Sequence, residues 1–431
     1  MIVYSPHITE RLKYTLEVIF KVILNCEYAL VSEVPDKDTD VQIINYSSGE
    51  YIKSSMQIIP NGLLHSNYIK PVNIPQEKYE GLPCIFYSGK GDFPFDVFSA
   101  VFFMVSRFEE YLPFVPDEHG RFRAEDSFAF RNGFHTIPIV ELWVKLLAKK
   151  LKINFPEHTF NQLLTIDIDN AWKYKNKGFL RVTGGLLSTF FRMDFKELGI
   201  RISVLSGKEK DPADTFSYIL KKQENLKLPI QFFILGGRRS KFDKAISLKN
   251  KNYRKLLHNL YLHNKYGLHP TYESNYSFKT LSREYYELCA VLTKRIDRSR
   301  QHFLKFTFPD TFRNLIKLGI REEHSLGWSS KVGFRAGISR PFPFYDLELE
   351  KQTHLMLVPF VVMDRTLKDY MNLNTEESKL KIKELIDSVR QVGGQFTMLW
   401  HNDSLNDKGE WQGWKEVFEW GIDYANQQEA G

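Results

Sequence analysis

The rhythm of hydrophobic and polar positions changes near residue 160. Before that point, short strand-like runs such as YALVSE, VQIINY and PCIFYS are mixed with helical segments at residues 8–23, 94–113 and 137–151. After it, apolar strand-like runs alternate with helical runs until the end of the chain. We therefore expect two domains, because a chain of 431 residues exceeds the usual size of one core. The first is a smaller accessory α/β domain over residues 1–155, and the second covers residues 160–431.

Alternation of strands and helices in the second half predicts a parallel sheet covered by helices. About seven strands over its length fit a (β/α) barrel or a distorted relative of one. In such folds the chemistry collects at the rim where strands end and loops begin. A helix beginning at Asn374 is predicted most sharply, because Asn374 and Glu377 have the spacing of a capping box and Gly393 follows the last apolar turn.

Two aspartates stand near the end of the apolar run LLTIDID. The side-chain period of two places Thr165, Asp167 and Asp169 on one face of this strand. Asp167 and Asp169 are then about 6–7 Å apart at the end of the strand. Buried carboxylates are costly unless something pairs with them, so either these two lie in water at a rim or a cation and a reaction explain them.

Other strand-like runs carry histidine or arginine near their ends. His269 emerges from GLHPTYES, Arg300 and His302 lie two apart in RQHFLKF, and His401 follows the apolar run FTMLW. A single histidine at a strand end is more often a hydrogen-bonded structural residue than a ligand. Four strands that deliver such side chains to one rim, however, indicate a functional site.

These residue types suit metal-assisted hydrolysis. A divalent ion held by carboxylate and imidazole acidifies water and polarises a carbonyl group. A second carboxylate can take the proton from the attacking water, while a histidine on the opposite side protonates a leaving amine. Positive charge or backbone amides must meet the oxyanion as it forms.

The motifs TIDIDNAW, GLHPTYES, SRQHF and MLWHND resemble, in order and spacing, those of polysaccharide deacetylases. This family is carbohydrate esterase family 4, the NodB homology domain, a distorted (β/α)7-type barrel. The motifs DPADTF, FFILGG, RQHFL, GFRAG and PFVVMD are similar to those of a branch found in bacterial cell-surface polysaccharide gene clusters. The resemblance covers about residues 160 to 405, and the first half resembles the poorly characterised domain that precedes the barrel in that branch.

The resemblance implies a hydrolase that removes N-acetyl groups from an amino-sugar glycan or glycan precursor, acting on C–N bonds other than peptide bonds. Asp167 matches the catalytic base, and Asp169 and His269 match metal ligands. Arg300 matches the arginine that orients the base, and His401 matches the general acid. The implied cofactor is a divalent metal, with Zn2+ favoured and Co2+, Ni2+ or Mn2+ as alternatives.

The sequence departs from the family pattern at three places. Ile168 separates two aspartates that are usually adjacent, so either could hold the metal. Position 273 is Glu where the family has its second metal histidine; Glu273 or His302 completes the ligand set, and we favour His302. Asn402 stands where an aspartate often supports the general acid, with Asp403 one step further on.

Three further residues have two interpretations each. Arg335, between the glycines of GFRAG, is a candidate substrate contact or a product of loop geometry. Trp400 is a candidate for stacking on a sugar ring or a core residue. Asp364, which ends PFVVMD, is expected to pair with Arg300 or to cap the segment that follows it.

Composition excludes some classes of function. The net charge is +7, but the basic residues are scattered along the chain, so a nucleic-acid partner is not expected and an anionic glycan or membrane surface is favoured only slightly. Cys26, Cys84 and Cys289 have no metal-type spacing and indicate a reduced, cytoplasmic protein. The first residues predict an amphipathic helix and not a signal peptide, and no apolar run is long enough to span a bilayer. The oligomeric state is not predicted.

Two other functions remain open. An Asp-x-Asp after a hydrophobic strand also holds metal and diphosphate in nucleotide-sugar glycosyltransferases, although no glycine-rich phosphate loop precedes Asp167. A degenerate, non-catalytic barrel that binds glycan is the second. Acetate release, stabilisation by a nucleotide sugar, or glycan binding without metal distinguishes the three.

Overall fold

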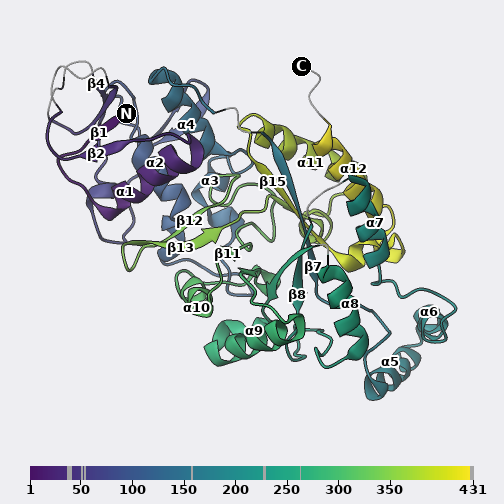
Figure 1. The fold of residues 1–431 in the computed structure, drawn as a ribbon. Helices are drawn as coiled ribbons and strands as arrows, with labels where there is room; N and C mark the ends of the chain where they lie inside the picture. Colours follow the sequence, from purple (N-terminus) through teal and green to yellow (C-terminus); the bar gives the residue numbers. More distant parts are fainter. Residues whose placement is uncertain are drawn as a thin grey trace.

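Two parallel sheets organise this mixed α/β chain, a small one in the first half and a large one in the second (Figure 1). The computed structural model describes residues 1–35, 41–49, 52, 55–156, 159–226, 230–262 and 264–427. The small sheet has the order β2-β1-β3-β4, with all neighbours parallel. A separate antiparallel hairpin, β5-β6, follows it.

The elements of the first half are short. They are β1 Ile2–Tyr4, α1 Glu10–Leu16, η1 Glu17–Ile23, β2 Ala29–Val31, β3 Ile43–Tyr46, β4 Ser55–Ile58, η2 Leu63–His65, β5 Gln76–Tyr79, β6 Leu82–Ile85, α2 Val97–Val105, η3 Phe108–Tyr111, η4 Ala124–Asp126, α3 Phe128–Arg131 and α4 Ile139–Lys150. Helix α2 is buried along its whole length, which explains its run of apolar residues. The capping oxygen of Asp96 starts it by accepting from the backbone N–H of Ser99.

The large sheet has nine strands in the order β12-β13-β11-β10-β9-β8-β7-β15-β14. All neighbours are parallel except β12 and β13. The strands are β7 Asn161–Ile168, β8 Ile230–Leu235, β9 Lys265–His269, β10 Arg298–Ser299, β11 Glu322–Glu323, β12 Phe342–Asp346, β13 Lys351–Leu357, β14 Val362–Met363 and β15 Gln395–His401.

Helices cover the outside of this sheet (Figure 1). The helices of the second half, of which α5 and α6 project away from the sheet, are α5 Phe179–Phe191, α6 Phe195–Leu205, α7 Phe216–Leu226, α8 Lys251–Tyr261, η5 Tyr272–Tyr276, α9 Phe278–Leu292, η6 His302–Leu304, α10 Asp310–Leu318, η7 Thr366–Tyr370, α11 Thr375–Arg390, η8 Asn402–Asn406, η9 Gly409–Trp411 and α12 Trp414–Asn426. The predicted capping box at the start of α11 is confirmed, with Asn374 and Glu377 bonded reciprocally. Among the described helices, none is both long enough and apolar enough to cross a membrane.

The large sheet must curl, because its two end regions are joined by a very short connection. Strands β13 and β14 lie seven places apart in the sheet order, which corresponds to about 34 Å in a flat sheet. Only residues 358–361 connect them, and such a segment spans at most about 18 Å. Within the described residues, however, no ladder joins the two ends. In place of a closed barrel, the structure therefore has a curled sheet whose two edges are not joined by paired strands within the described residues.

The two halves share one continuous apolar core, whose buried residues run from Val3 to Ala425. The GFRAG segment lies at their contact. The backbone N–H of Phe334 donates to the carbonyl oxygen of His135, and that of Val140 donates to the carbonyl oxygen of Gly337. Gly333 has φ +120°, and a Cβ there would lie 2.3 Å from the His135 carbonyl oxygen. Glycine is required at position 333 because the first half approaches the backbone so closely.

One predicted strand is wrong. The RQHFLKF segment was expected to be a strand with Arg300 and His302 on one face. The strand β10 covers only Arg298–Ser299, and His302 begins the short helix η6. Phe303 and Leu304 both have positive φ, so the backbone turns sharply immediately after His302. This turn, and not strand alternation, directs His302 toward the sheet end.

Candidate metal centre and active site

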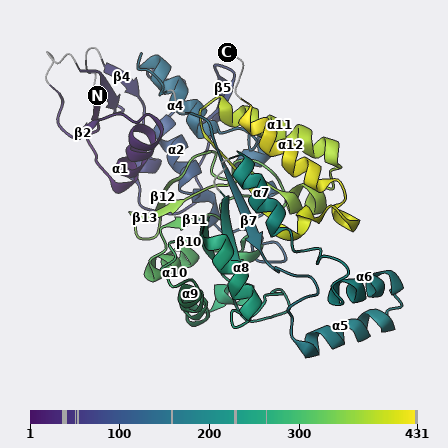
Figure 2. The same cartoon turned by 45° about the vertical axis from the view of Figure 1, so that its right-hand side comes forward.

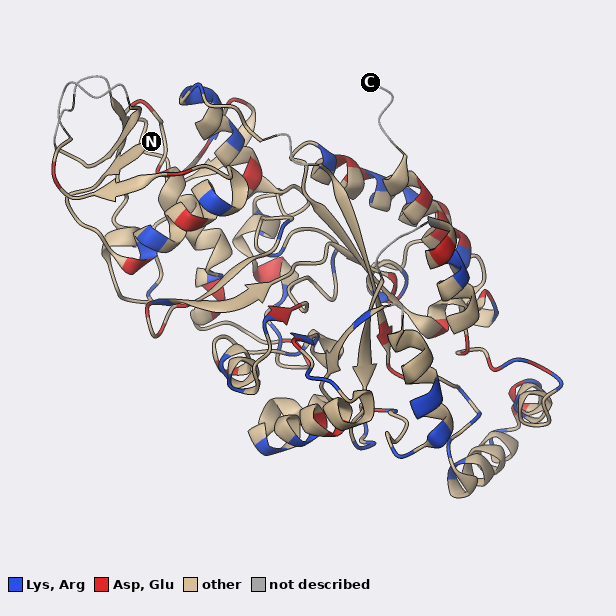
Figure 3. Ribbon diagram, viewed as in Figure 1, with Lys and Arg blue, Asp and Glu red and all other residues tan. Residues whose placement is uncertain are grey.

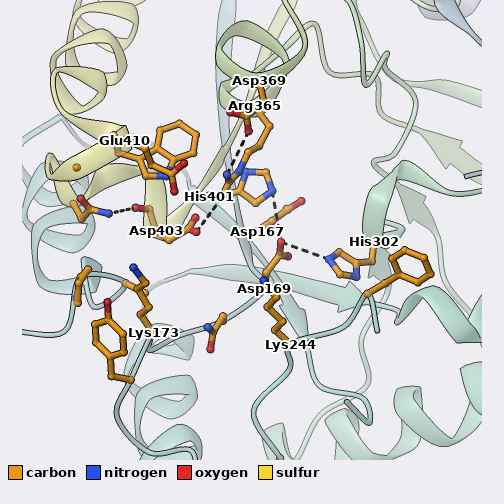
Figure 4. A pocket seen from close by; sticks show the side chains of 18 of the residues that line it. Asp167, Asp169, Lys173, Lys244, His302, Arg365, Asp369, His401, Asp403 and Glu410 are labelled. Carbon is orange, nitrogen blue, oxygen red and sulfur yellow. Dashed lines mark hydrogen bonds and ion pairs between the residues drawn. The ribbon is translucent and has the colours of Figure 1, made fainter. Parts of the chain in front are cut away.

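A large pocket opens at the C-terminal ends of the parallel strands. Its volume is about 1160 Å3, and its lining includes Asp167, Asp169, His269, His302 and His401. Asp167 lies on β7 and Asp169 one residue beyond it, while His269 and His401 are the last residues of β9 and β15. The structure brings these Asp and His side chains together, whereas Arg300, which was expected on the same rim, is fully buried and does not line the pocket. Figure 4 shows Asp169 between His302 and His401.

Asp169, His269 and His302 form a group whose ligand atoms all lie within 4.8 Å of one another. Nε2 of His269 is 3.2 Å from Oδ1 of Asp169, and Nε2 of His302 is 3.5 Å from its Oδ2. Glu273, the alternative ligand suggested by sequence, is exposed on η5 and does not belong to this group. Sequence reasoning favoured His302 over Glu273, and the geometry has the same preference.

The hydrogen bonds of the two histidines orient their free nitrogens toward Asp169. Nδ1 of His269 lies 2.5 Å from the carbonyl oxygen of Arg300, and that of His302 lies 2.8 Å from Oδ1 of Asp243. A carbonyl or carboxylate oxygen can only accept, so each Nδ1 carries a proton and Nε2 is the nitrogen of each ring that can bind a cation. This is the usual support for a metal-ligating histidine.

The group fits a cation. Oδ1 of Asp169 is buried and has no hydrogen-bond partner among the residues that the structure describes. Nε2 of His269 lies 3.2 Å from it, so a positive charge is required between these two atoms, which a cation can supply. Burial raises the pKa of the Asp169 carboxyl, but in the absence of a cation the positive charge of His302 lowers it more, together with hydrogen bonds from the histidines and the charge of His401, so that its net pKa is well below the usual value. One carboxylate and two imidazoles are a typical donor set for Zn2+ and related ions.

Asp167 is held by Arg300 and not by the metal group. Nη1 of Arg300 donates to Oδ1 of Asp167 at 2.9 Å and to Oγ1 of Thr165 at 2.8 Å. The Arg300 side chain is fully buried and packs over the ring of Phe233. Oδ2 of Asp167 does not face Arg300, and it lies 3.7 Å from Nε2 of His269. One oxygen of Asp167 is thus fixed and the other faces the metal group.

His401 is supported by Asp364, for which we expected another role. Nδ1 of His401 lies 2.7 Å from Oδ1 of Asp364, which is fully buried. Asp364 was expected to pair with Arg300 or to cap the segment that follows it; it holds the His401 ring and also accepts from the backbone N–H of Arg365, so the pairing with Arg300 is wrong. It also accepts from the hydroxyl of Ser404 and the backbone N–H of His401. Burial alone lowers the pKa of His401, but the Asp364 carboxylate raises it more, to about 10.

Asn402 does not replace this supporting carboxylate. Its side chain is buried and donates to the carbonyl oxygen of Ala213 at 2.6 Å. Asp403 pairs with Arg365 at 2.9 Å on the pocket wall, and Arg365 packs over the ring of Trp411 (Figure 4). The carboxylate that sequence reasoning sought next to His401 comes from the end of β14, which is the neighbour of β15 in the sheet. A prediction that β14 pairs with β15 would have identified Asp364 as this carboxylate.

Two expected substrate contacts lie outside the pocket lining. Arg335 is buried and forms a two-oxygen ion pair with Glu110 of the first half, at 2.5 and 2.9 Å. Trp400 is fully buried and packs on Phe418 of α12. Both side chains point into the packed interior, because the GFRAG loop docks on the first half and position 400 faces the covering helices.

The first half contributes to the pocket. Arg121 lines it, donates to Oδ2 of Asp117 and donates through Nη1 to the carbonyl oxygen of Phe303, next to His302. His119 packs edge-on against the Phe303 ring at 4.8 Å between centroids. Sequence reasoning left the role of the first half undetermined, because nothing in its local pattern shows that this turn reaches the sheet end.

Comparisons with known proteins give a family for the first half alone. Residues 1–156 match a family described as a family of unknown function, DUF7033. No curated protein matches the chain.

Several solved structures are distantly similar. A protein described as a polysaccharide deacetylase from Mycobacterium smegmatis has 13% identity and a TM-score of 0.42, covering 64% of this chain and 87% of that one. PuuE allantoinase has 9% identity and a TM-score of 0.40, covering 63% and 85%. A protein described as a polysaccharide deacetylase from Pseudomonas aeruginosa PAO1 has 10% identity and a TM-score of 0.40, covering 64% and 90%. These likenesses are too distant to assign an activity.

Proposed function

We propose that this chain is a metal-dependent hydrolase that removes N-acetyl groups from an amino-sugar glycan or glycan precursor during assembly of a cell-surface polysaccharide. The observation that carries the proposal is the convergence of Asp167, Asp169, His269, His302 and His401 on one pocket. The order and spacing of the motifs that contain them resemble those of polysaccharide deacetylases. The proposal extends to a cytoplasmic location, which the three free cysteines favour.

Asp169, His269 and His302 would hold the cation, for which Zn2+ is favoured and Co2+, Ni2+ or Mn2+ are alternatives. A divalent cation supplies Lewis acidity, which polarises an amide carbonyl and acidifies water. Asp243 and the carbonyl oxygen of Arg300 fix the two rings, so the ligands are oriented before the cation arrives.

Asp167 is suited to accept the proton of the attacking water. Arg300 immobilises Oδ1, and Oδ2 remains directed toward the metal group. This division gives the base one fixed orientation, which a general base requires. Arg300 is a positioning residue, because it is fully buried and does not line the pocket.

His401 is suited to protonate the leaving amine. Asp364 binds its Nδ1, so Nε2 points into the pocket and lies 3.9 Å from Oδ2 of Asp169. The base and the acid come from the adjacent strands β7 and β15, where His401 and Asp167 are register partners. An amide bound between them has water activation on one side and proton delivery on the other.

The pocket has the size and lining of a saccharide site. Its volume of about 1160 Å3 exceeds the ~1000 Å3 upper range of drug-sized ligand sites, so it can accept more than one sugar ring. Tyr174, Tyr370 and Trp411 line it together with several lysines and carboxylates. Aromatic faces and charged hydrogen-bonding groups are what a polyhydroxylated ligand requires.

The direct test is release of acetate from an N-acetylglucosamine oligosaccharide by protein loaded with Zn2+ or Co2+. We expect release that stops when a chelator removes the cation. Asp167→Asn should lose turnover while still binding the cation, because Asn cannot accept the proton but preserves the shape of the site. Asp214→Asn is the matched control, since Asp214 is an aspartate outside the pocket lining.

Two results would contradict the proposal. One is acetate release that is unchanged in Asp167→Asn. The other is the absence of release from every N-acetylated saccharide offered to protein with a demonstrated bound cation.

A further inference from the structure

A helical hairpin projects from the body of the molecule (Figures 1 and 2). Its apolar side chains are exposed. It consists of α5 and α6 and lies between β7 and α7 in the chain. Its exposed apolar side chains are Phe179 81%, Leu180 86%, Leu187 57%, Phe190 54%, Phe191 78%, Met193 76%, Phe195 64% and Ile202 53% exposed. A cluster of this many bulky apolar side chains on a solvent-exposed surface is typical of an interaction site.

The hairpin has almost no core of its own. Thr189 is the buried residue of α5 and Val204 is that of α6. Leu180, Leu187 and Phe191 follow the spacing of seven and four that places side chains on one face of a helix, and that face is exposed. Helices in proteins owe most of their stability to packing of their apolar face. A binding partner that covers the exposed face of this pair would therefore stabilise it.

Basic residues are concentrated at the same place. Residues 171–210 contain nine Lys or Arg and three Asp or Glu, a surplus of six, while the whole chain has a surplus of seven. Residues 238–255 contain eight Lys or Arg and one Asp. Arg181 joins the two segments by donating to the carbonyl oxygens of Lys244 and Ala245. Basic residues are therefore denser in this region than we expected from the sequence, and blue segments lie at one end of α5 and on α8 (Figure 3).

The acidic residues of the hairpin are engaged with the protein itself. Asp194 caps α6 by accepting from the backbone N–H of Glu197. Glu197 accepts from the hydroxyl of Tyr174 and pairs with Arg201. The outward charge of the region is consequently positive.

We propose that the α5–α6 hairpin docks the protein on an anionic lipid surface. Its Phe, Leu and Met side chains enter the boundary between headgroups and acyl chains, and the surrounding lysines and arginines contact the anionic headgroups. Exposed bulky apolar side chains beside a cluster of cations are the combination that binds such interfaces. The hairpin binds to the surface and does not span the bilayer.

The hairpin also forms part of the pocket wall. Lys196, Ile200 and Arg201 of α6 line the same pocket as Asp169 and His401. Docking would hold that pocket at the lipid surface, where an N-acetylated saccharide carried on a lipid could reach it. This consequence for the substrate class rests on the proposed function, whereas the docking itself does not.

The experiment is sedimentation of the full chain with large vesicles. We expect binding to vesicles of phosphatidylcholine and phosphatidylglycerol in equal parts, and much weaker binding to phosphatidylcholine alone or at high salt. The double variant Phe190→Ser and Phe191→Ser should weaken binding at least about tenfold, because it removes two exposed aromatic side chains. The double variant Arg192→Glu and Lys208→Glu should also weaken it, by reversing charge at the surface.

The matched control is the double variant Leu349→Ser and Leu380→Ser, which removes two similarly exposed apolar side chains elsewhere. It should bind as the unaltered chain does. The proposal is overturned if the unaltered chain does not sediment with anionic vesicles, if both pairs of apolar substitutions have the same effect, or if the hairpin instead mediates a dimer that ignores lipid. Acetate release from a soluble oligosaccharide, measured on the same variants, tests the proposed function separately, since Phe190 and Phe191 do not line the pocket.

Discussion

Two clusters of charged and titratable side chains differ in how completely their members are paired. The interface cluster is Arg107, Glu109, Glu110 and Arg335, between the two halves of the chain. The pocket cluster is Asp167, Asp169, His269, His302 and His401, at the end of the large sheet. In the interface cluster each arginine is matched by glutamate: Arg107 bonds Glu109 and Glu110, and Arg335 bonds both oxygens of Glu110.

The pocket cluster is not satisfied in this way. Within the described part of the chain, Oδ1 of Asp169 has no hydrogen-bond partner, and Nε2 of both His269 and His302 converges on the Asp169 carboxylate. Buried polar groups are normally paired, so this incomplete pairing points to a ligand outside the chain. The comparison teaches that incomplete pairing, and not burial or charge, separates a site from a structural network.

The largest expected effect is the loss of the cation. Asp169→Asn should abolish cation binding and acetate release together, because it removes the negatively charged ligand that lies next to both histidines. The measurement is the rise in thermal midpoint on adding Zn2+, which the unaltered chain should show and the variant should not. A cation-dependent rise that persists in Asp169→Asn would place the cation elsewhere.

Removal of the acid comes next. His401→Ala should lower kcat by about 10²- to 10⁴-fold, which is the usual contribution of a positioned general acid. The cation should remain bound, because the ligand group does not include His401. Steady-state kinetics with metal analysis on the same sample check this, and full turnover in the variant would refute the role of His401.

The interface cluster should respond in stability and not in chemistry. Arg335→Met leaves Glu110 with Arg107 alone, and removing one member of a buried pair costs about 3–5 kcal/mol. Chemical denaturation should show this loss, while kcat per folded molecule stays the same. Arg123→Met, at an exposed pair with Asp126, is the matched control and should leave stability unchanged. A large fall in kcat of folded Arg335→Met would revive a substrate role for Arg335.

The smallest effect is expected for a residue that orients a ligand without binding the cation itself. Asp243→Asn weakens the support of His302 without removing a ligand, so cation affinity should fall about 10- to 100-fold. Competition with a chelating dye measures it. Glu273→Gln should leave the affinity unchanged, because Glu273 is exposed outside the ligand group.

The sequence predicts the site best where a regular strand delivers the residue. Asp167, His269 and His401 lie at the ends of β7, β9 and β15, where apolar runs and parallel pairing fix both position and direction. It predicts less where the chain is irregular. His302 reaches the site through the turn at Phe303 and Leu304, whose positive φ angles no local pattern announces.

Contacts between residues far apart in the chain are the second feature that could not be predicted from the sequence. The pairing of Asp364 with His401 follows from β14 lying beside β15, and the burial of Arg335 follows from docking of residues 333–337 on the first half. Each contact joins segments far apart in the chain, so hydrophobic periodicity carries no information about it. The same holds for the curl of the large sheet, which is set by the short connection between β13 and β14.

The most direct measurement of the central claim is anomalous X-ray scattering from crystals grown with Zn2+. The account predicts a single strong anomalous peak about 2.0–2.2 Å from one oxygen of Asp169 and from Nε2 of His269 and His302. A crystal with Zn2+ in solution but no peak between these three side chains, or a peak at Glu273 in their place, would contradict it.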